Sequence, residues 1–148
     1  MTLSAPDPNC IFCKIVRGEI PARIVYRDAR FVAFLDIHPV SRGHTLLVPT
    51  THVTSLARID PPALEGLPEV LPALAGAVMR AVGADGLNLL NNTGCSAGQV
   101  VEHLHIHLIP RWTRDDVGLL NWRPREVEAA ELEGLERRIR DALAGRTA

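Results

Sequence analysis

The stretch that decides the fold reads Val100-Val101-Glu102-His103-Leu104-His105-Ile106-His107-Leu108-Ile109-Pro110-Arg111. Histidine and apolar residues alternate along its centre, and successive side chains of an extended strand point to opposite faces of a sheet. The pattern therefore predicts a strand over residues 100–111 with three histidines on one face. The opposite face is apolar and belongs in a core; it carries Leu104, Ile106 and Leu108, with Val100 continuing it.

Three imidazoles on one strand face indicate either a metal site or catalysis. Same-face neighbours lie roughly 6.6–7 Å apart, which separates His103 from His107 by about 13 Å. Zn–N bonds measure only about 2.0–2.1 Å, so one ion bridges two adjacent imidazoles of this row but hardly all three without a sharp bend. Alternatively, a neutral imidazole acts as nucleophile or general base near neutral pH. A polar face exposed to water is the third interpretation, although such faces usually carry Lys, Glu and Thr.

Length, charge and cysteine content bound the class of protein. With 148 residues and a net charge of −1, the chain is expected to form one domain, and it lacks the basic excess that binding to nucleic acid or an anionic membrane requires. No apolar run approaches a membrane span, and residues 1–9 show no signal-peptide pattern. Three cysteines, an odd number, argue against a secreted disulfide framework. We expect a protein of the reducing cytoplasm.

Periodicity and turn residues predict five short strands with helices between and after them. Two strand connections are tight, so most of the sheet should be antiparallel, and the fold class is α+β. The strands are expected over residues 22–26, 30–35, 45–48, 86–92 and 100–111. The helices are expected over residues 10–17 with Asn9 as N-cap, near 55–58, over 60–82 with a break or kink at Pro68 and Pro72, and from Pro124 onward.

These elements divide the chain into three segments. Residues 1–9 are polar and proline-rich and are expected to be a flexible tail. Residues 10–111 form the core of the domain. Residues 112–148 extend the same domain with an apolar patch at 119–122 and an amphipathic last helix, which we expect to cover the sheet. The apolar stripe of that helix is Val127, Leu132, Leu135 and Ile139.

A Cys-x-x-Cys pair at Cys10 and Cys13 is a candidate metal site. Two cysteines on one helical turn can share a zinc ion if two more ligands approach, and His52 and His103 are the candidates because both lie at element ends. Free cysteines and redox chemistry are the alternatives; a redox site of the thioredoxin kind would need a βαβ context that is not predicted here. Cys95 lies in a polar loop and is expected to be a bystander.

Three further features have both a structural and a functional interpretation. Asp36 closes an apolar strand, where it either caps a turn or accepts hydrogen bonds from vicinal hydroxyls such as those of a ribose. His44 starts a strand, either facing water or facing a site. The small residues of 94–99 let backbone N–H groups approach an anion, although the pattern matches no established phosphate-binding fingerprint.

Taken together, several ordered motifs resemble the histidine triad (HIT) family, in its bacterial Hint- and Fhit-like hydrolase branch. The histidine stretch is similar to the family signature His-φ-His-φ-His-φ-φ, in which φ is apolar. The matching blocks upstream are residues 10–21, 34–39 and 42–49. The resemblance implies an α+β homodimer with a half-barrel sheet. It also implies that the protein binds a purine nucleoside monophosphate moiety and cleaves at its α-phosphorus.

The resemblance implies a separate role for each polar residue. His105, the middle histidine, would be the nucleophile and form a covalent nucleotidyl-imidazole, which splits a difficult displacement into two easier steps. His107 and His44 would contact the phosphate and its leaving group. The remaining contacts would come from Asp36 at the ribose, from Asn92 and Gln99 at the phosphate, and from Ile11, Phe12, Ile15, Ile20, Phe34 and Ile37 around the base.

The same resemblance implies a structural zinc ion, held by Cys10, Cys13, His52 and His103 in a closed four-coordinate site. Two positions matter for activity. Val100 stands where Hint- and Fhit-like members carry Ser or Thr, which removes a hydroxyl from the phosphate site. His107 stands where the nucleotidyltransferase branch carries Gln, which favours transfer to water.

Three hypotheses about function follow. The first is a hydrolase that releases a purine nucleoside monophosphate from a phosphoramidate, an ester or a dinucleoside polyphosphate through His105. The alternative is a nucleotide-binding signalling protein of the same fold with negligible turnover. The third is a metal carrier or redox protein that uses the cysteine and histidine clusters.

Overall fold

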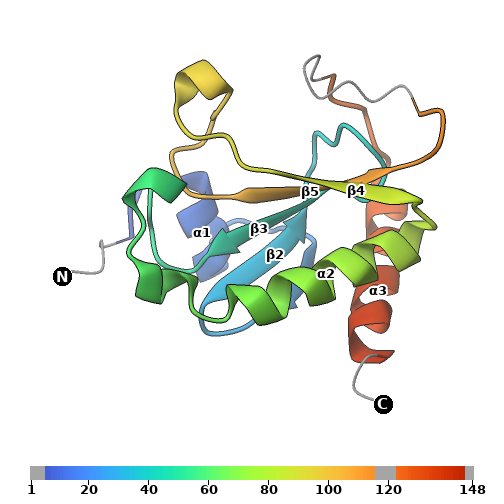
Figure 1. Cartoon of the computed structure of the whole chain (residues 1–148), viewed down its shortest axis with the longest axis horizontal. Helices are drawn as coiled ribbons and strands as arrows, with labels where there is room; N and C mark the ends of the chain where they lie inside the picture. The colour runs from blue at the N-terminus through green and yellow to red at the C-terminus, as the bar shows by residue number, and fades with distance from the viewer. Residues whose placement is uncertain (1–5, 116–122, 146–148) are drawn as a thin grey trace.

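The computed structural model describes residues 6–115 and 123–145. Figure 1 shows their arrangement, with a central sheet and helices on both of its faces. The strands are β1 Ile24–Arg27, β2 Phe31–Leu35, β3 Thr45–Pro49, β4 Gly86–Leu90 and β5 Ile106–Arg111. The α-helices are α1 Ile11–Arg17, α2 Leu67–Val82 and α3 Ala129–Ala144, and short 3-10 turns lie at Leu56–Arg58, Pro61–Leu64 and Cys95–Ala97.

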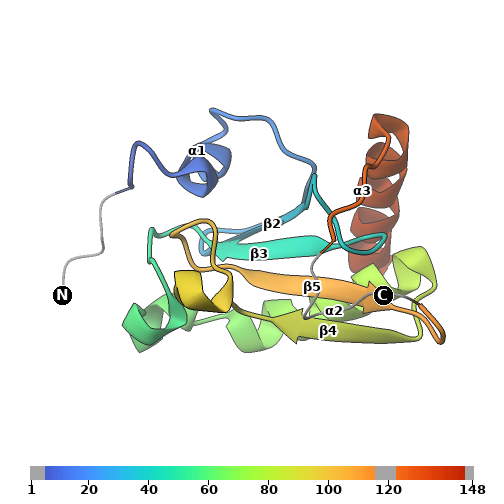
Figure 2. The same cartoon turned by 90° about the horizontal axis from the view of Figure 1, so that it is seen from above.

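Within these residues the five strands form one sheet in the order β1-β2-β3-β5-β4, and every neighbouring pair is antiparallel. The α+β class is therefore confirmed. The long connection from β3 to β4 carries α2 beneath the sheet, and β5 then returns between them (Figures 1 and 2). The histidine-bearing strand thus occupies an interior position of the sheet, with a partner on each side.

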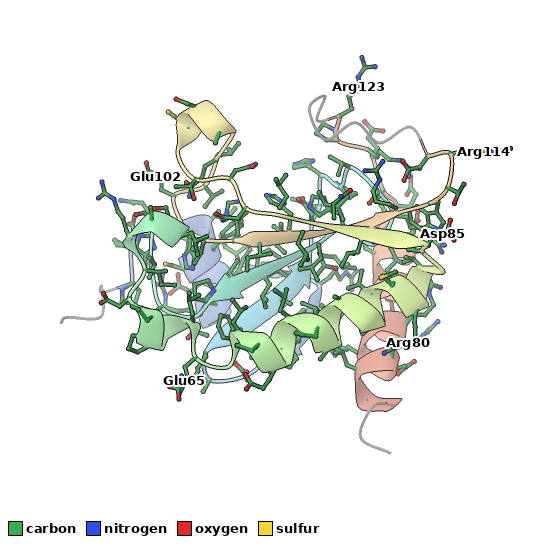
Figure 3. All side chains as sticks on the ribbon, viewed as in Figure 1. Glu65, Arg80, Asp85, Glu102, Arg114 and Arg123 are labelled. Atoms are coloured by element: carbon green, nitrogen blue, oxygen red, sulfur yellow. The ribbon has the colours of Figure 1, made fainter. Side chains whose placement is uncertain are left out.

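Both faces of the sheet are covered, because alternate residues of β2 point into two separate cores. Phe31, Ala33 and Leu35 pack with the apolar face of α2 and with Leu135 and Ile139 of α3. Their neighbours Val32 and Phe34 point the other way and join a cluster under α1. This explains why all five residues of β2 are buried. Charged side chains such as Glu65, Arg80 and Arg114 instead point outward (Figure 3).

The helix ends follow local chemistry. Cys10, and not the predicted Asn9, is the N-cap of α1, because its Sγ accepts the backbone N–H of Cys13 at 3.5 Å. Gly18 ends α1 in the left-handed conformation that glycine adopts at no steric cost. The break expected at the prolines of the second helical stretch lies before them, at Gly66. Pro68 falls in the first turn of α2, and Pro72 lies inside a helix that continues to Val82.

The strand predicted over residues 100–111 begins only at Ile106, and this corrects the opening expectation. β5 pairs with β3 up to Leu47–Ile106, and β3 ends two residues later at Pro49, which has no N–H to donate to a ladder. The chain before Ile106 therefore leaves the sheet, where the backbone N–H of Leu104 donates to the carbonyl of Val53 at 2.6 Å. Val100, expected to continue the apolar face, is 91% exposed.

The last helix begins at Ala129 and not at Pro124, with Glu128 as its N-cap. It packs on α2 and on β1, and Arg140 donates to the carbonyl of Ile24 at 2.8 Å. The predicted apolar patch at 119–122 lies outside the described residues. In the part of the chain that the structure describes, no helix is long and apolar enough to cross a membrane.

Candidate active site and metal centre

Four cysteine and histidine side chains meet where α1 approaches the two segments that flank the sheet. Cys10 and Cys13 come from the start of α1, His52 follows β3, and His103 precedes β5. The Sγ atoms of Cys10 and Cys13 lie 3.5 and 3.6 Å from Nδ1 of His103, and Sγ of Cys13 lies 3.3 Å from Nδ1 of His52. One ligand atom from each residue lies within 4.8 Å of all the others.

This donor set fits a tetrahedral zinc ion. Zn–S bonds of about 2.3 Å and Zn–N bonds of about 2.0–2.1 Å place sulfur and nitrogen ligands about 3.5 Å apart. The Nε2–H of His103 donates to the carbonyl of Pro49 at 2.9 Å, which leaves the Nδ1 lone pair facing the thiols. Burial raises the pKa of the Cys13 thiol, so a cation is what would stabilise its thiolate here. The structure thus brings together the four predicted metal ligands.

His105 is oriented by the opposite ring nitrogen. Its Nδ1–H donates to the carbonyl of His103 at 2.7 Å, which makes Nε2 the nitrogen with the lone pair. The carbonyl of His105 itself accepts from Nδ2 of Asn91 at 2.8 Å, so a side chain takes over where the β4–β5 ladder ends. The ring of Phe12 packs edge-on against the imidazole, with 5.3 Å between centroids. His105 is therefore a buried imidazole whose tautomer and orientation are both determined.

His44 and His107 form a second pair across β3 and β5. Nε2 of His44 lies 2.9 Å from Nδ1 of His107. Nδ1 of His44 accepts the backbone N–H of Val40 at 3.3 Å, so the ring carries its proton on Nε2 and donates it to His107. His107 consequently carries its own proton on Nε2. The ring of His107 lies 4.8 Å from that of His105, which places the pair beside the candidate nucleophile.

Asp36 completes this group, and the geometry favours a hydrogen-bond relay over a second metal site. Asp36, His44 and His107 offer three ligand atoms within 4.8 Å of one another. However, Oδ2 of Asp36 lies 3.6 Å from Nδ1 of His44, whereas His107 contacts Nε2 on the other side of the same ring. The two lone-pair directions of an imidazole diverge, so a single ion cannot use both contacts.

Burial keeps these imidazoles neutral near pH 7. Removal from water lowers the pKa of His44 to about 3 and that of His107 to about 3, and in each case a neighbouring histidine lowers it further. Burial also lowers the pKa of His105. A neutral imidazole keeps the lone pair that a nucleophile or a general base requires.

Asp36 also shows the turn-capping role that the sequence offered as an alternative. Its Oδ1 accepts the backbone N–H of His38 at 2.8 Å. His38 itself is exposed, as expected of a surface residue. The capping contact fixes the carboxylate at the exit of β2, next to His44.

The six apolar residues predicted around a base divide into two groups. Phe12, Ile15 and Phe34 are buried in the cluster under α1, and Ile20 packs against that cluster. The rings of Phe12 and Phe34 meet edge to face at 5.5 Å. Ile11 and Ile37 are 44% and 64% exposed, respectively.

The small-residue loop is held by the amide of Gln99. Its Oε1 accepts the backbone N–H of Gly94 at 2.7 Å, and its Nε2 donates to the carbonyls of Thr54 and Val101 at 2.6 and 2.9 Å. Asn92 lies beside the loop, since a Cβ added at Gly98 would lie 3.6 Å from its Nδ2. Gln99 therefore fixes the shape of the loop and ties it to the segment that carries His52.

Sequence reasoning missed the groups that orient the histidines. Three are backbone groups: the carbonyls of Pro49 and His103 and the N–H of Val40. They have no residue-type signal. The fourth, Asn91, could have been found, because an asparagine directly after a strand that pairs with the histidine stretch is positioned to bond its backbone.

Comparison with known proteins agrees with this geometry. The sequence model of the HIT domain matches residues 17–114, and the chain belongs to the HIT family. A crystal structure of a Zn-bound histidine triad family protein from Mycobacterium smegmatis superposes with a TM-score of 0.82 at 36% identity, over 94% of this chain and 96% of that one. The fold predicted from the family resemblance is confirmed.

Two relatives have names that state an activity. Adenylylsulfatase HINT3 from Arabidopsis thaliana is 42% identical over 72% of this chain, which spans about half, 54%, of that protein's length. Adenosine 5'-monophosphoramidase hnt1 from Schizosaccharomyces pombe is 36% identical over 88% of this chain and 96% of its own length.

Proposed function

We propose that this protein is a nucleotide hydrolase that cleaves at the α-phosphorus of a purine nucleoside monophosphate conjugate through a covalent intermediate on His105. The observation that carries the proposal is the orientation of His105: the Nδ1–H is held by a backbone carbonyl, and the lone pair is on Nε2. The activities in the names of the two relatives, an adenylylsulfatase and a monophosphoramidase, support the same class of reaction.

The first chemical step forms a bond between Nε2 of His105 and the α-phosphorus, while the bond from phosphorus to the leaving group breaks. The leaving group needs a proton, and the donor in this proposal is the Nε2–H of His107, since the relay through His44 puts the proton there. In the second step water attacks the phosphorus and returns its proton to His107. The P–N bond then breaks and His105 is released in its neutral form.

The substrate-binding roles follow from position. In this proposal Asp36 accepts the ribose hydroxyls, and the cluster of Phe12, Ile15, Ile20 and Phe34 provides an apolar wall for a purine, with Ile11 and Ile37 at its exposed margin. Asn92 and Gln99 flank the phosphate, and the loop that Gln99 holds offers backbone N–H groups to the non-bridging oxygens. The leaving group is an amine, a sulfate or a second nucleotide.

Zinc has a structural role in this proposal. Cys10, Cys13, His52 and His103 would hold the ion in a closed tetrahedral set, which supplies a crosslink between α1, the segment after β3 and the segment before β5. The Zn-bound relative supports this assignment. Since α1 also provides Phe12, the crosslink would fix the wall against which His105 packs.

We also propose that two chains associate as a homodimer. β4 lies at an edge of the sheet and pairs only with β5 among the described residues, and Leu89 on it is 51% exposed. An uncovered edge strand with an apolar side chain is suited to pairing with a second copy. Sedimentation equilibrium should give twice the chain mass, and replacement of Leu89 by Lys should shift the equilibrium toward monomer.

The test of the activity is to trap the intermediate. A labelled adenylate donor, mixed and acid-quenched within the first turnover, should label the wild-type protein and leave His105→Ala unlabelled. His38→Ala is the matched control, because His38 is exposed and has no part in the proposal. Equal labelling of His105→Ala would contradict the mechanism. Hydrolysis no faster than a buffer blank, together with tight AMP binding by calorimetry, would favour the nucleotide-binding alternative.

A further inference from the structure

The loop over residues 36–44 carries Asp36 at one end and His44 at the other, and it is packed tightly against the core on one side. Val40 and Ser41 are buried. Gly43 has a φ of +81°, and a Cβ at this position would lie 2.8 Å from Cγ1 of Val82 in α2. The loop cannot move toward α2, so its position depends on what holds its other side.

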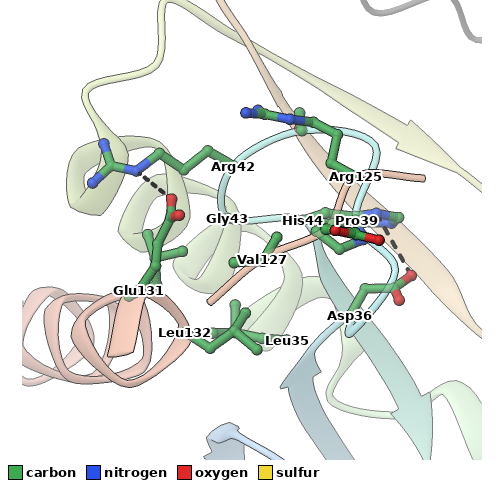
Figure 4. A pocket seen from close by; sticks show the side chains of 13 residues that line it. Leu35, Asp36, Pro39, Arg42, Gly43, His44, Arg125, Val127, Glu131 and Leu132 are labelled. Atoms are coloured by element: carbon green, nitrogen blue, oxygen red, sulfur yellow. Dashed lines mark hydrogen bonds and ion pairs between the residues drawn. The ribbon is translucent and has the colours of Figure 1, made fainter. Parts of the chain in front are cut away.

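That other side is covered by residues 123–131, which we call the strap; they precede α3 and form its first turn. The backbone N–H of Arg125 donates to the carbonyl of Pro39 at 2.7 Å. Nε of Arg42 donates to Oε1 of Glu131 at 3.2 Å. Figure 4 shows the Arg42–Glu131 contact and the Asp36–His44 contact on the same loop.

A small cavity of about 20 Å³ lies between the strap and the loop, and its wall includes Asp36, Ser41 and His44. The hydroxyl of Ser41 is buried in this wall and has no hydrogen-bond partner among residues 6–115 and 123–145. A cavity of this size has room for about one water molecule. The two segments therefore meet through two direct contacts around a polar space, and the loop is not locked by close packing on this side.

The strap itself has a rigid anchor. α3 buries Leu135 and Ile139 completely in the main core. Arg138 donates to the carbonyl of Ala81 at 3.0 Å, and Arg140 donates to that of Ile24 at 2.8 Å. Glu131 thus sits one turn from a fixed helix face, and its bond to Arg42 transmits that fixed position to the loop.

We propose that Glu131 and Arg42 are positioning residues that hold the 36–44 loop, and through it the contact between His44 and His107, in the geometry that catalysis needs. The inference rests on the proposed function for its effect on rate. Neither side chain touches the imidazoles. Both are 43% exposed, so their ion pair contributes little to global stability, and its role is local.

The first experiment compares steady-state kinetics of Glu131→Gln, Arg42→Gln and the double variant with adenosine 5'-phosphoramidate as substrate. Each single variant should lower kcat by roughly tenfold with KM nearly unchanged, because a displaced general acid slows chemistry more than binding. The double variant should be no slower than either single variant. Glu133→Gln is the matched control, since Glu133 is exposed on the same helix. Additive losses, or a control as slow as Glu131→Gln, would overturn the proposal.

The second experiment does not depend on turnover. Long-range ¹H–¹⁵N spectra of the histidine side chains report the tautomer and hydrogen bonding of His44 and His107. Glu131→Gln should shift both sets of ring resonances and leave its melting temperature within about a degree of wild type, whereas Glu133→Gln should shift neither. Unchanged ring resonances in Glu131→Gln would overturn the proposal even if the protein proves to hydrolyse nothing.

Discussion

Two histidines separated by one residue have opposite orientations, and the comparison between their surroundings explains the site. In His103 the Nε2–H is bound by the carbonyl of Pro49, so Nδ1 faces two thiols. In His105 the Nδ1–H is bound by the carbonyl of His103, so the lone pair is on Nε2. The residue type is the same, and the backbone carbonyl that each ring meets decides between a metal ligand and a nucleophile.

The largest expected effect concerns the metal half of this comparison. Cys13→Ser should lose the zinc ion and lower the free energy of unfolding by more than about 5 kcal/mol, because metal binding in such a site is also folding free energy. Denaturant unfolding with and without a chelator measures this. Wild type with chelator should match the variant, and Cys95→Ser is the control because Cys95 is exposed. Equal stability of Cys13→Ser and wild type would contradict a structural zinc.

The next effect sharpens the catalytic half. His44→Asn keeps a polar atom near the position of Nδ1 and removes the Nε2 contact to His107. We expect kcat to fall by about 10²-fold, the usual contribution of a positioned acid or base, while AMP affinity changes little. His38→Asn should behave as wild type. A His44→Asn enzyme with full kcat would remove the relay from the mechanism.

Acid stability tests the burial of the same pair. The folded pKa values of His44 and His107, about 3, lie below the unfolded value of 6.5, so the unfolded chain binds more protons. Stability is therefore fully present above pH 6.5 and is lost as pH falls toward 3. Each imidazole should contribute a slope of about 1.4 kcal/mol per pH unit. Urea melts from pH 7 to 4.5 should show a shallower slope in His44→Asn; parallel slopes would refute the assignment.

The smallest effect is expected at Val100. Its side chain is 91% exposed, so Val100→Ser should change the free energy of unfolding by less than about 0.5 kcal/mol. A hydroxyl restored beside Gln99 is expected to raise kcat/KM by only a few-fold. A tenfold loss of stability-corrected activity would show instead that Val100 is needed at the site.

Much of this fold could be predicted from the sequence, and the failures have a physical cause. The alternating histidines gave the correct strand type, but alternation does not encode where a partner strand ends. Pro49 ends β3, so residues 100–105 leave the sheet and His103 can turn toward α1. Spacing on a continuous strand suggested that the three rings could hardly share one ion. The bend before Ile106 is what lets His103 join a different set of ligands altogether.

The candidate site divides in the same way. Residue types pointed to Cys10, Cys13, His52 and His103, and the structure places them together because their chemistry is visible in the side chain. The roles of Pro49 and Val40 were not predictable, because they act through backbone groups that every sequence has. The strap contact at Glu131 was also hidden, since an exposed glutamate on an amphipathic helix gives no hint of a partner 89 residues away.

The division of labour between His103 and His105 is tested most directly by measuring two quantities on one sample of His105→Asn. Zinc content by elemental analysis should remain at about one ion per chain. The covalent nucleotide adduct, detected by intact-mass spectrometry after a quenched single turnover, should disappear. Loss of both zinc and adduct would show that the two histidines serve one metal centre, and an adduct that persists would place the nucleophile elsewhere.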